Sequence, residues 1–156
     1  MARVEAGLFM LDVDYTAATH AWIEGQKSSP YEMGLGWTVA LDKPGYFVGR
    51  RALEREAREG STWKLVGVEV DWEGLERLYA AVGLPPQIPA MAVRASLPVR
   101  KDGRQVGYAS TSTWSPLLKK YIALVHLERP HYEPGTRVEI EITVAHHRRH
   151  VQRTRR

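Results

Sequence analysis

The hydrophobic periodicity of the chain changes at Gly60, and this change limits the folds that it can adopt. Residues 48–59 carry Arg and Glu at i,i+4 spacing beside a narrow apolar stripe, which predicts a surface helix that ends at Gly60. After Gly60, apolar residues recur at every second position, as in a strand with one buried face. Residues 138–144 show this most clearly, because valine and isoleucine alternate there with glutamate and threonine. We therefore expect an α+β chain, with a mixed first part and a β domain after it.

Other segments of the second part also predict strands, at 66–70, at 106–108 after a Lys-Asp-Gly turn, and at 121–127. Residues 72–90 interrupt them with a helical pattern that Pro85-Pro86 ends. Strands at this spacing indicate a small antiparallel barrel or sandwich. In the first part, we expect a helical turn after Pro30 and an extended segment over 37–41.

Residues 107–127, GYASTSTWSPLLKKYIALVHL, place a hydroxyl-rich stretch between two short apolar runs. A hairpin turn needs only about two to five residues. The sequence therefore predicts a connection over 110–120 that is longer than a plain hairpin turn requires.

The charge distribution argues against nucleic acid as a partner. The net charge is +4, but residues 146–156 hold five arginines and no acidic residue, which leaves 17 basic and 18 acidic residues elsewhere. A nucleic-acid footprint needs a basic patch on the fold itself. The chain has no cysteine, no apolar run of membrane-spanning length and no signal-peptide pattern, so we expect a cytoplasmic protein without a membrane partner.

Three segments occur together in this chain: RVEAGLFMLDVD at 3–14, SPYEMGLGWTVALDKPGYFVGRRALERE at 29–56 and VRKDGRQVGYASTSTWSPLLKKYIALVHL at 99–127. In this order they resemble the C-terminal half of the glycine-cleavage T-protein family of folate-dependent aminomethyltransferases. The resemblance extends to folate-dependent demethylases and to the folate-binding halves of dimethylglycine and sarcosine dehydrogenases.

The resemblance implies a six-stranded antiparallel β-barrel over residues 61–156, preceded by a remnant of the folate-binding α/β domain over residues 1–60. It also implies one-carbon transfer to tetrahydrofolate, with folate, a lipoyl carrier protein and the missing N-terminal half as partners. The catalytic aspartate and the folate-clamping glutamate of the family lie in that other half, so we assign no catalytic residue here. No metal is expected.

Three residues are candidate folate contacts. The resemblance places Arg3 at the glutamate carboxylates of folate, to which a guanidinium offers a bidentate fork. Trp37 and Trp114 are able to stack on the pterin or benzoyl ring, although packing is the alternative for both.

Other polar residues are read as structural. For Glu5 and Glu32 we expect solvated or capping roles rather than acid–base chemistry. We expect Asp12 and Asp14 to form part of a turn, and we expect Lys119 and Lys120 to be solvated loop residues. The histidines of the tail have no carboxylate nearby, so their spacing does not predict a metal site.

Two functions stay open on the sequence alone. The first is the C-terminal portion of a tetrahydrofolate-dependent aminomethyltransferase. The second is a non-catalytic interaction module, or the barrel half of a split or multi-domain folate-dependent demethylase or dehydrogenase.

Overall fold

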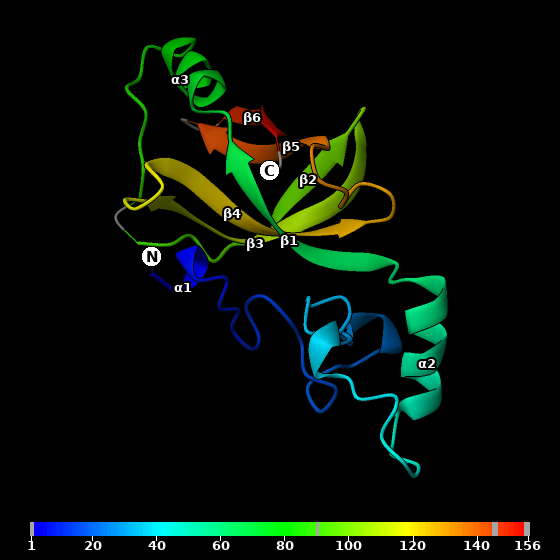
Figure 1. The fold of residues 1–156 in the computed structure, drawn as a ribbon. Helices are drawn as coiled ribbons and strands as arrows, with labels where there is room; N and C mark the ends of the chain where they lie inside the picture. The colour runs from blue at the N-terminus through cyan, green and yellow to red at the C-terminus, as the bar shows by residue number, and fades with distance from the viewer. Residues whose placement is uncertain (1, 90, 145–146, 155–156) are drawn as a thin grey trace.

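The structure, a computed structural model, describes residues 2–89, 91–144 and 147–154. Figure 1 shows an N-terminal part with little regular secondary structure beside a β domain. The N-terminal part contains α1 (Ala2–Glu5), two 3-10 turns (Glu24–Gln26 and Gly36–Thr38) and α2 (Arg50–Glu59). The β domain contains β1 (Trp63–Val70), α3 (Trp72–Ala80), β2 (Leu97–Lys101), β3 (Arg104–Ser115), β4 (Lys120–Glu128), β5 (Arg137–Val144) and β6 (His147–Thr154).

The predicted helix over 48–59 is confirmed as α2, two residues shorter at its start. Gly49 precedes it with a φ of 88°, a left-handed conformation that a helix cannot continue through. Gly60 ends it as predicted, with a φ of 75° and an N–H that donates to the carbonyl of Glu56.

The extended segment predicted over 37–41 is wrong at its start, because Gly36–Thr38 forms a 3-10 turn. The N–H and the hydroxyl of Thr38 both donate to the carbonyl of Leu35, at 2.8 and 2.7 Å. A local side-chain hydrogen bond of this kind competes with extended structure.

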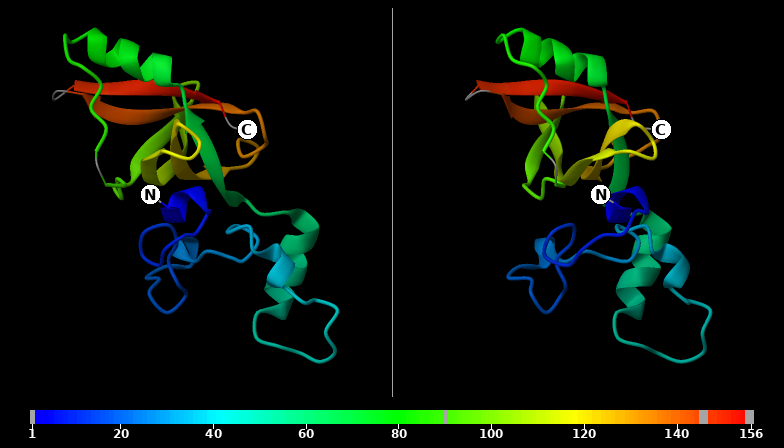
Figure 2. Two further views of the ribbon diagram at one scale, coloured as in Figure 1. Left: turned by 60° about the vertical axis from the view of Figure 1, so that its left-hand side comes forward. Right: turned by 90° about the vertical axis from the view of Figure 1, so that its left-hand side faces the viewer.

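The helical pattern after residue 72 is confirmed as α3. Asp71 caps it, since its carboxylate accepts from the N–H of Gly74 at 3.1 Å. Figures 1 and 2 show α3 alongside β6, on the side of the β domain away from the N-terminal part. Leu75 is buried there against Val70. No helix in the described part of the chain is long and apolar enough to cross a membrane.

The strands pair antiparallel throughout, in the order β1-β4-β3-β2-β5-β6. Strand β6 pairs along the whole of β5 and meets β1 at two residue pairs, Glu69 with Thr154 and Val70 with Arg153. Asp102 and Gly103 form the β2–β3 turn, both with positive φ, as in the primed turns that suit a two-residue hairpin. The predicted α+β class, with an antiparallel sheet in the second part, is confirmed.

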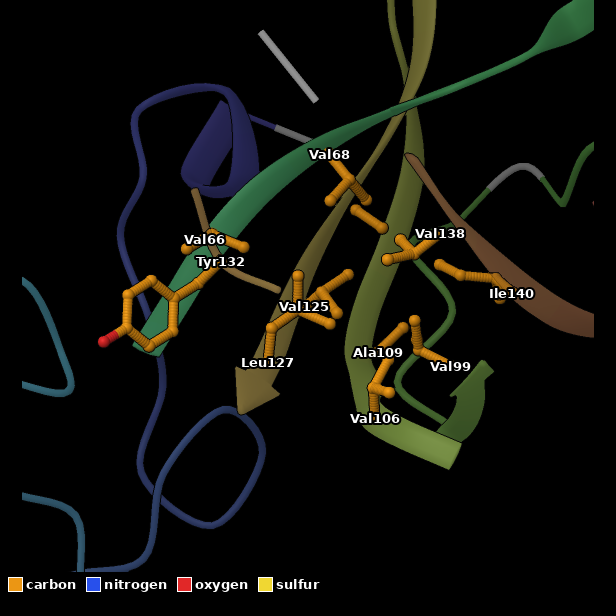
Figure 3. Packing of buried hydrophobic residues seen from close by; sticks show 11 residues of the cluster. Val66, Val68, Val99, Val106, Ala109, Val125, Leu127, Tyr132, Val138 and Ile140 are labelled. Carbon is orange, nitrogen blue, oxygen red and sulfur yellow. The ribbon is translucent and has the colours of Figure 1, made fainter. Parts of the chain in front are cut away.

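The core of the β domain lies between the strands (Figure 3). Val99, Val125 and Ile140 are completely buried in it, and Tyr132 packs at its edge. The alternation predicted for β5 holds in part: Val138, Ile140 and Val144 are buried and Arg137 and Thr143 are exposed, but Ile142, Glu139 and Glu141 are all half-buried. Burying side chains of this size stabilises the fold by about 1.5–3 kcal/mol each.

The long connection predicted over 110–120 is wrong. Strand β3 runs to Ser115, β4 begins at Lys120, and only residues 116–119 turn between them. The polar composition misled the prediction because all four hydroxyl residues at 110–113 are buried. Buried hydroxyls are tolerated on a strand when other segments supply their hydrogen-bond partners, and the N-terminal part and β4 supply several of them here.

Candidate functional site

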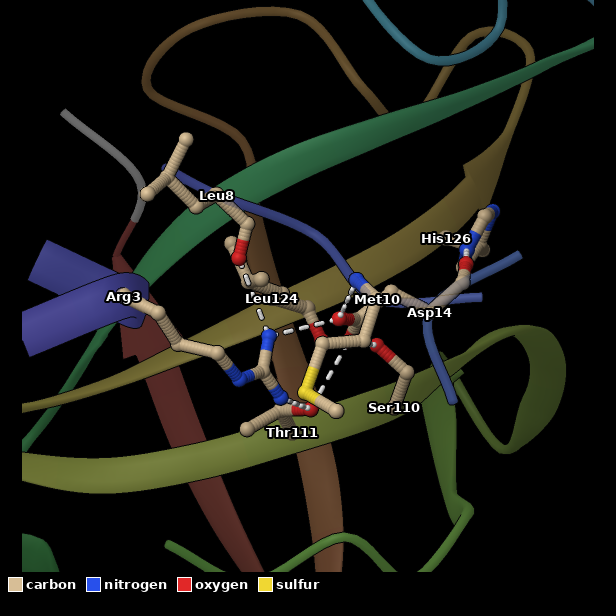
Figure 4. A network of polar contacts seen from close by, with 8 residues as sticks. All are labelled: Arg3, Leu8, Met10, Asp14, Ser110, Thr111, Leu124 and His126. Carbon is tan, nitrogen blue, oxygen red and sulfur yellow. Dashed lines mark hydrogen bonds and ion pairs between the residues drawn. The ribbon is translucent and has the colours of Figure 1, made fainter. Parts of the chain in front are cut away.

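A buried polar network joins the start of the chain to β3 (Figure 4). Arg3, on α1, donates from Nη1 to Oδ2 of Asp14 at 2.7 Å and from Nη2 to Oγ1 of Thr111 at 2.9 Å. Nη1 also donates to the carbonyl of Leu8 at 3.0 Å. Residues more than a hundred positions apart are thereby fixed to one another by charge-assisted hydrogen bonds.

Asp14 is the centre of this network. Its side chain has no exposed surface, and its carboxylate accepts four hydrogen bonds, so its acceptor capacity is filled. Oδ1 accepts from the hydroxyls of Ser110 (2.6 Å) and Thr111 (2.7 Å), while Oδ2 accepts from Arg3 and from the N–H of Met10 (2.8 Å). Burial by itself raises the pKa of Asp14, but the hydrogen bonds from Ser110, Thr111, Met10 and Arg3 together lower the pKa below its ordinary value.

His126, on β4, holds the backbone of the same aspartate. Its Nε2 lies 2.5 Å from the carbonyl oxygen of Asp14, and since a carbonyl only accepts, Nε2 is the protonated nitrogen. The ring is buried and stacks on Tyr108, with centroids 4.8 Å apart. Desolvation by burial lowers the pKa of His126 and outweighs the opposing effect of the Asp14 carbonyl and carboxylate.

Glu5 makes a second tether between α1 and the β domain. Its Oε1 accepts from the hydroxyl of Ser115 at 2.6 Å and from the N–H of Leu117 at 3.3 Å. Ser115 is completely buried at the end of β3, and its hydroxyl oxygen accepts from the N–H of Leu118. Glu5 therefore has a structural role, although it tethers distant segments and is not the solvated or capping residue that was expected.

Glu32, the other carboxylate considered for acid–base chemistry, forms a capping box. Its Oε2 accepts from the N–H of Ser29 at 3.0 Å, and the hydroxyl of Ser29 accepts from the N–H of Glu32 at 3.1 Å. Burial raises the pKa of Glu32, the hydrogen bond from Ser29 opposes that rise, and the neighbouring charge of Glu56 adds to it.

The three predicted folate contacts do not gather into one cluster. Arg3 lies on the face of β3 that Thr111 presents. Trp114 follows Thr111 by three residues along a regular stretch of the strand, so its side chain leaves the opposite face, where it packs edge-on against Trp72 with ring centroids 5.4 Å apart. Trp37, in a 3-10 turn of the N-terminal part, is 83% exposed.

No three potential metal ligands gather among the described residues. The tail histidines His146, His147 and His150 have side chains outside the described residues. Lys120 pairs with Glu69 at 2.8 Å, which differs from the solvated role predicted for it.

Sequence reasoning missed Asp14, Ser110, Thr111 and His126 as members of one site. The local signals pointed to a turn at Asp14 and to a connection at 110–120. One signal was available in principle, namely that consecutive hydroxyl residues inside an apolar run need partners once buried. That signal does not say which distant residue provides them.

Comparisons with known proteins find similarity to one family and its members. The family model described as the glycine cleavage T-protein C-terminal barrel domain matches residues 80–155. An aminomethyltransferase of Prochlorococcus marinus (strain NATL1A) is 35% identical over 140 residues, which is 90% of this chain and 31% of that protein. One from Synechococcus sp. (strain CC9902) is 32% identical over the same share of each.

A solved structure agrees at the level of the fold. The crystal structure of glycine cleavage system aminomethyltransferase T from Bartonella henselae superposes with a TM-score of 0.68 and 18% identity, over 98% of this chain and 35% of that one. The chain spans about a third of the length of the curated relatives that it matches, less than the half expected from the sequence.

Proposed function

We propose that this chain is the C-terminal portion of a tetrahydrofolate-dependent aminomethyltransferase, because residues 80–155 match the model of the glycine cleavage T-protein C-terminal barrel domain and 90% of the chain is similar to part of an aminomethyltransferase. One observation supports the proposal most directly. The guanidinium of Arg3 is held between α1 and β3, and the side chain of Arg3 is still 18% exposed. The resemblance assigned a carboxylate of folate to this same residue.

The chemistry of Arg3 suits that role. A guanidinium with a fixed orientation binds a carboxylate with more specificity than a flexible ammonium group, because its planar fork is already ordered. In the proposed reaction tetrahydrofolate accepts a one-carbon unit, and Arg3 orients it through its glutamate tail. Trp37 is exposed and available for a ring contact, whereas Trp114 points away from Arg3 and supports the proposal less.

The finer assignments belong to the same proposal. Residues 1–60 form the remnant of a folate-binding domain, and residues 61–156 form the barrel, which six strands close completely through β6. Tetrahydrofolate, a lipoyl carrier protein and the remaining part of an aminomethyltransferase are the partners. No residue of this chain is given a catalytic role.

A second candidate function is that of an interaction module, and the exposure of large apolar side chains favours it. Among its described residues, the N-terminal part presents seven of them: Leu8 (63% exposed), Leu11 (41%), Trp22 (93%), Ile23 (65%), Trp37 (83%), Tyr46 (72%) and Val48 (95%). A groove of about 680 Å³ between α1 and the β3–β4 turn adds Leu117 and Leu118, which are 79% and 52% exposed. Such surface is typical of protein interfaces.

The partner that this surface fits is the remaining part of an aminomethyltransferase, since the relatives are about three times as long as the matched region. The two candidate functions are therefore compatible, and they differ only in whether the assembled protein is catalytic.

A chimera tests the proposal. The Prochlorococcus marinus relative would receive this chain in place of its matching C-terminal third. We expect the chimera to transfer an aminomethyl group from a lipoyl carrier protein to tetrahydrofolate, and the 156-residue chain alone to show no turnover. A folded chimera that binds its partners but is inactive would leave the interaction module as the better account. Turnover by the chain alone would contradict the need for a partner.

A further inference from the structure

The hydrogen bonds of Arg3 occupy one edge of its guanidinium. An arginine has five N–H donors. Nη1 uses both of its donors, on the carbonyl of Leu8 and on Asp14, and Nη2 uses one, on Thr111. Two donors remain without a partner among the described residues, namely Nε–H and one N–H of Nη2.

The geometry decides which N–H of Nη2 is occupied. Thr111 donates to Oδ1 of Asp14 at 2.7 Å and accepts from Nη2, while Oδ2 of the same carboxylate accepts from Nη1. These contacts close a ring on the Nη1/Nη2 edge, as Figure 4 shows. The remaining donors of Nε and Nη2 are therefore adjacent and form the other fork of the guanidinium, which matches a carboxylate.

Arg50 provides an internal comparison, because it is also a half-buried arginine held by several acceptors. Its Nε donates to Glu54 at 2.8 Å, and its Nη groups donate to the carbonyls of Leu41, Lys43 and Gly45. Four of its five donors are used, including Nε, so Arg50 has no free fork. The two arginines therefore differ at the Nε/Nη2 edge of the guanidinium, whose Nε donor is bonded in Arg50 and has no partner among the described residues in Arg3.

We propose that Asp14 and Thr111 are positioning residues, which fix the guanidinium of Arg3 so that its Nε/Nη2 fork faces a carboxylate ligand. This inference rests on the proposed function for the identity of that ligand, but the positioning itself does not. Asp14 has no exposed surface and Thr111 is 1% exposed, so neither contacts the ligand, and both act through Arg3. The hydroxyl of Thr111 is essential because it bridges the aspartate and the arginine.

The experiment uses the full 156-residue chain labelled with ¹⁵N, with the guanidinium signals of Arg3 assigned by their loss in Arg3→Lys. A guanidinium held at both Nη groups rotates slowly, so we expect separate Nη signals for Arg3 in the wild type. Thr111→Ser, which keeps the hydroxyl, should retain them. Thr111→Val, which has the same shape without the hydroxyl, should merge them, and so should Asp14→Asn.

The ligand side of the proposal is tested with glutarate, a dicarboxylate that resembles the tail of a glutamate. We expect glutarate to shift the Nε–H signal of Arg3 in the wild type and in Thr111→Ser. In Thr111→Val we expect glutarate to bind about ten-fold more weakly, because the guanidinium fork is no longer held in one orientation. The Nε–H of Arg50 is the control and should not move.

Two results would overturn the proposal. The first is that the Nη signals of Arg3 are averaged in the wild type, or that they stay separate in Thr111→Val. This result counts only if the backbone amide spectrum of the protein stays dispersed, which shows that the protein is folded. The other is a glutarate response that is absent at Arg3 or equal at Arg50. Neither measurement uses folate. If the proposed function is wrong, the Nη signals and the glutarate response of Arg3 are unaffected, so failure of this proposal is distinguishable from failure of the proposed function.

Discussion

The two parts of the molecule are held together by different interactions. In the β domain, strands that meet around Val99, Val125 and Ile140 leave these side chains without exposed surface. In the N-terminal part, large apolar side chains such as Trp22 and Val48 are almost fully exposed, and α1 is fixed to β3 by polar contacts. The N-terminal part also buries Val4 and Met33, but most of its large apolar side chains are exposed. Burial therefore stabilises mainly the β domain, while directional hydrogen bonds set how α1 lies on β3.

The largest effect is expected in the core of the β domain. Ile140→Asp places an unpaired carboxylate where no surface is exposed, and we expect a loss of about 5 kcal/mol in the free energy of unfolding, or no folding at all. Thr143→Asp puts the same side chain on the exposed face of β5 and should cost about 1 kcal/mol or less. Urea unfolding followed by circular dichroism measures both, and similar losses would show that the two faces of β5 do not differ as described.

The next effect concerns the polar tether. Asp14→Ala leaves the guanidinium of Arg3 and two buried hydroxyls without their acceptor, so we expect a loss of about 3–5 kcal/mol in the free energy of unfolding. Asp12→Ala is the control, because its carboxylate is 57% exposed and, among the described residues, its side chain pairs with the exposed His20. Asp12 has a φ of 58°, which alanine adopts less readily than aspartate, so this change should cost about 1 kcal/mol at most. If Asp14→Ala is as mild as Asp12→Ala, the tether does not hold the N-terminal part.

A pH dependence follows from His126. Its pKa is lowered in the folded state, so the unfolded state binds more protons as the pH falls below about 6.5. The stability that the neutral ring contributes is present above that pH and is lost as the pH falls through the folded pKa, with a slope of up to about 1.4 kcal/mol per pH unit.

Urea unfolding between pH 8 and pH 5, roughly the range in which histidine titrates, measures this slope. His126→Gln should reduce it, whereas His20→Gln, at an exposed position, should not. A slope that is the same in all three proteins would rule out His126 as its source.

The smallest effect is expected at the exposed apolar surface. Trp37→Ser removes a large ring that is 83% exposed, and we expect a change of less than about 0.5 kcal/mol in the free energy of unfolding. The same change should weaken binding of the remaining part of an aminomethyltransferase if that surface is an interface. A loss of several kcal/mol in the chain alone would mean that Trp37 is packed, and the contrast between the two parts would no longer hold.

The regular elements of this fold were the predictable ones. The glycine at the end of α2, the Arg50–Glu54 pair on its surface and most of the alternation in β5 follow from local signals, and these appear in the structure. The hydroxyl residues of β3 were misread because local polarity suggests a loop, whereas their partner Asp14 lies nearly a hundred residues earlier in the chain.

The candidate site was predictable only in part. The resemblance identified Arg3, but the edge of its guanidinium that stays open depends on Thr111 and Leu8, and no sequence pattern encodes that geometry. Likewise, the opposite orientation of Trp114 follows from the register of β3 after its bulge, which pairing with β4 sets. Contacts between distant segments are what the sequence alone leaves undetermined.

The most direct test of the account is the affinity for 5-formyltetrahydrofolate, measured by tryptophan fluorescence in the chimera and in the 156-residue chain alone. We expect binding in the micromolar range, about 8 kcal/mol, for the chimera and at least about a hundred-fold weaker binding for the chain alone. Arg3→Lys keeps the charge beside Asp14 but loses the fork, and should weaken the chimera about ten-fold or more, while Arg51→Ala, at an exposed position of α2, should not. Equal affinity of the Arg3→Lys and wild-type chimeras, or tight binding by the chain alone, would contradict a shared folate site that Arg3 helps to form.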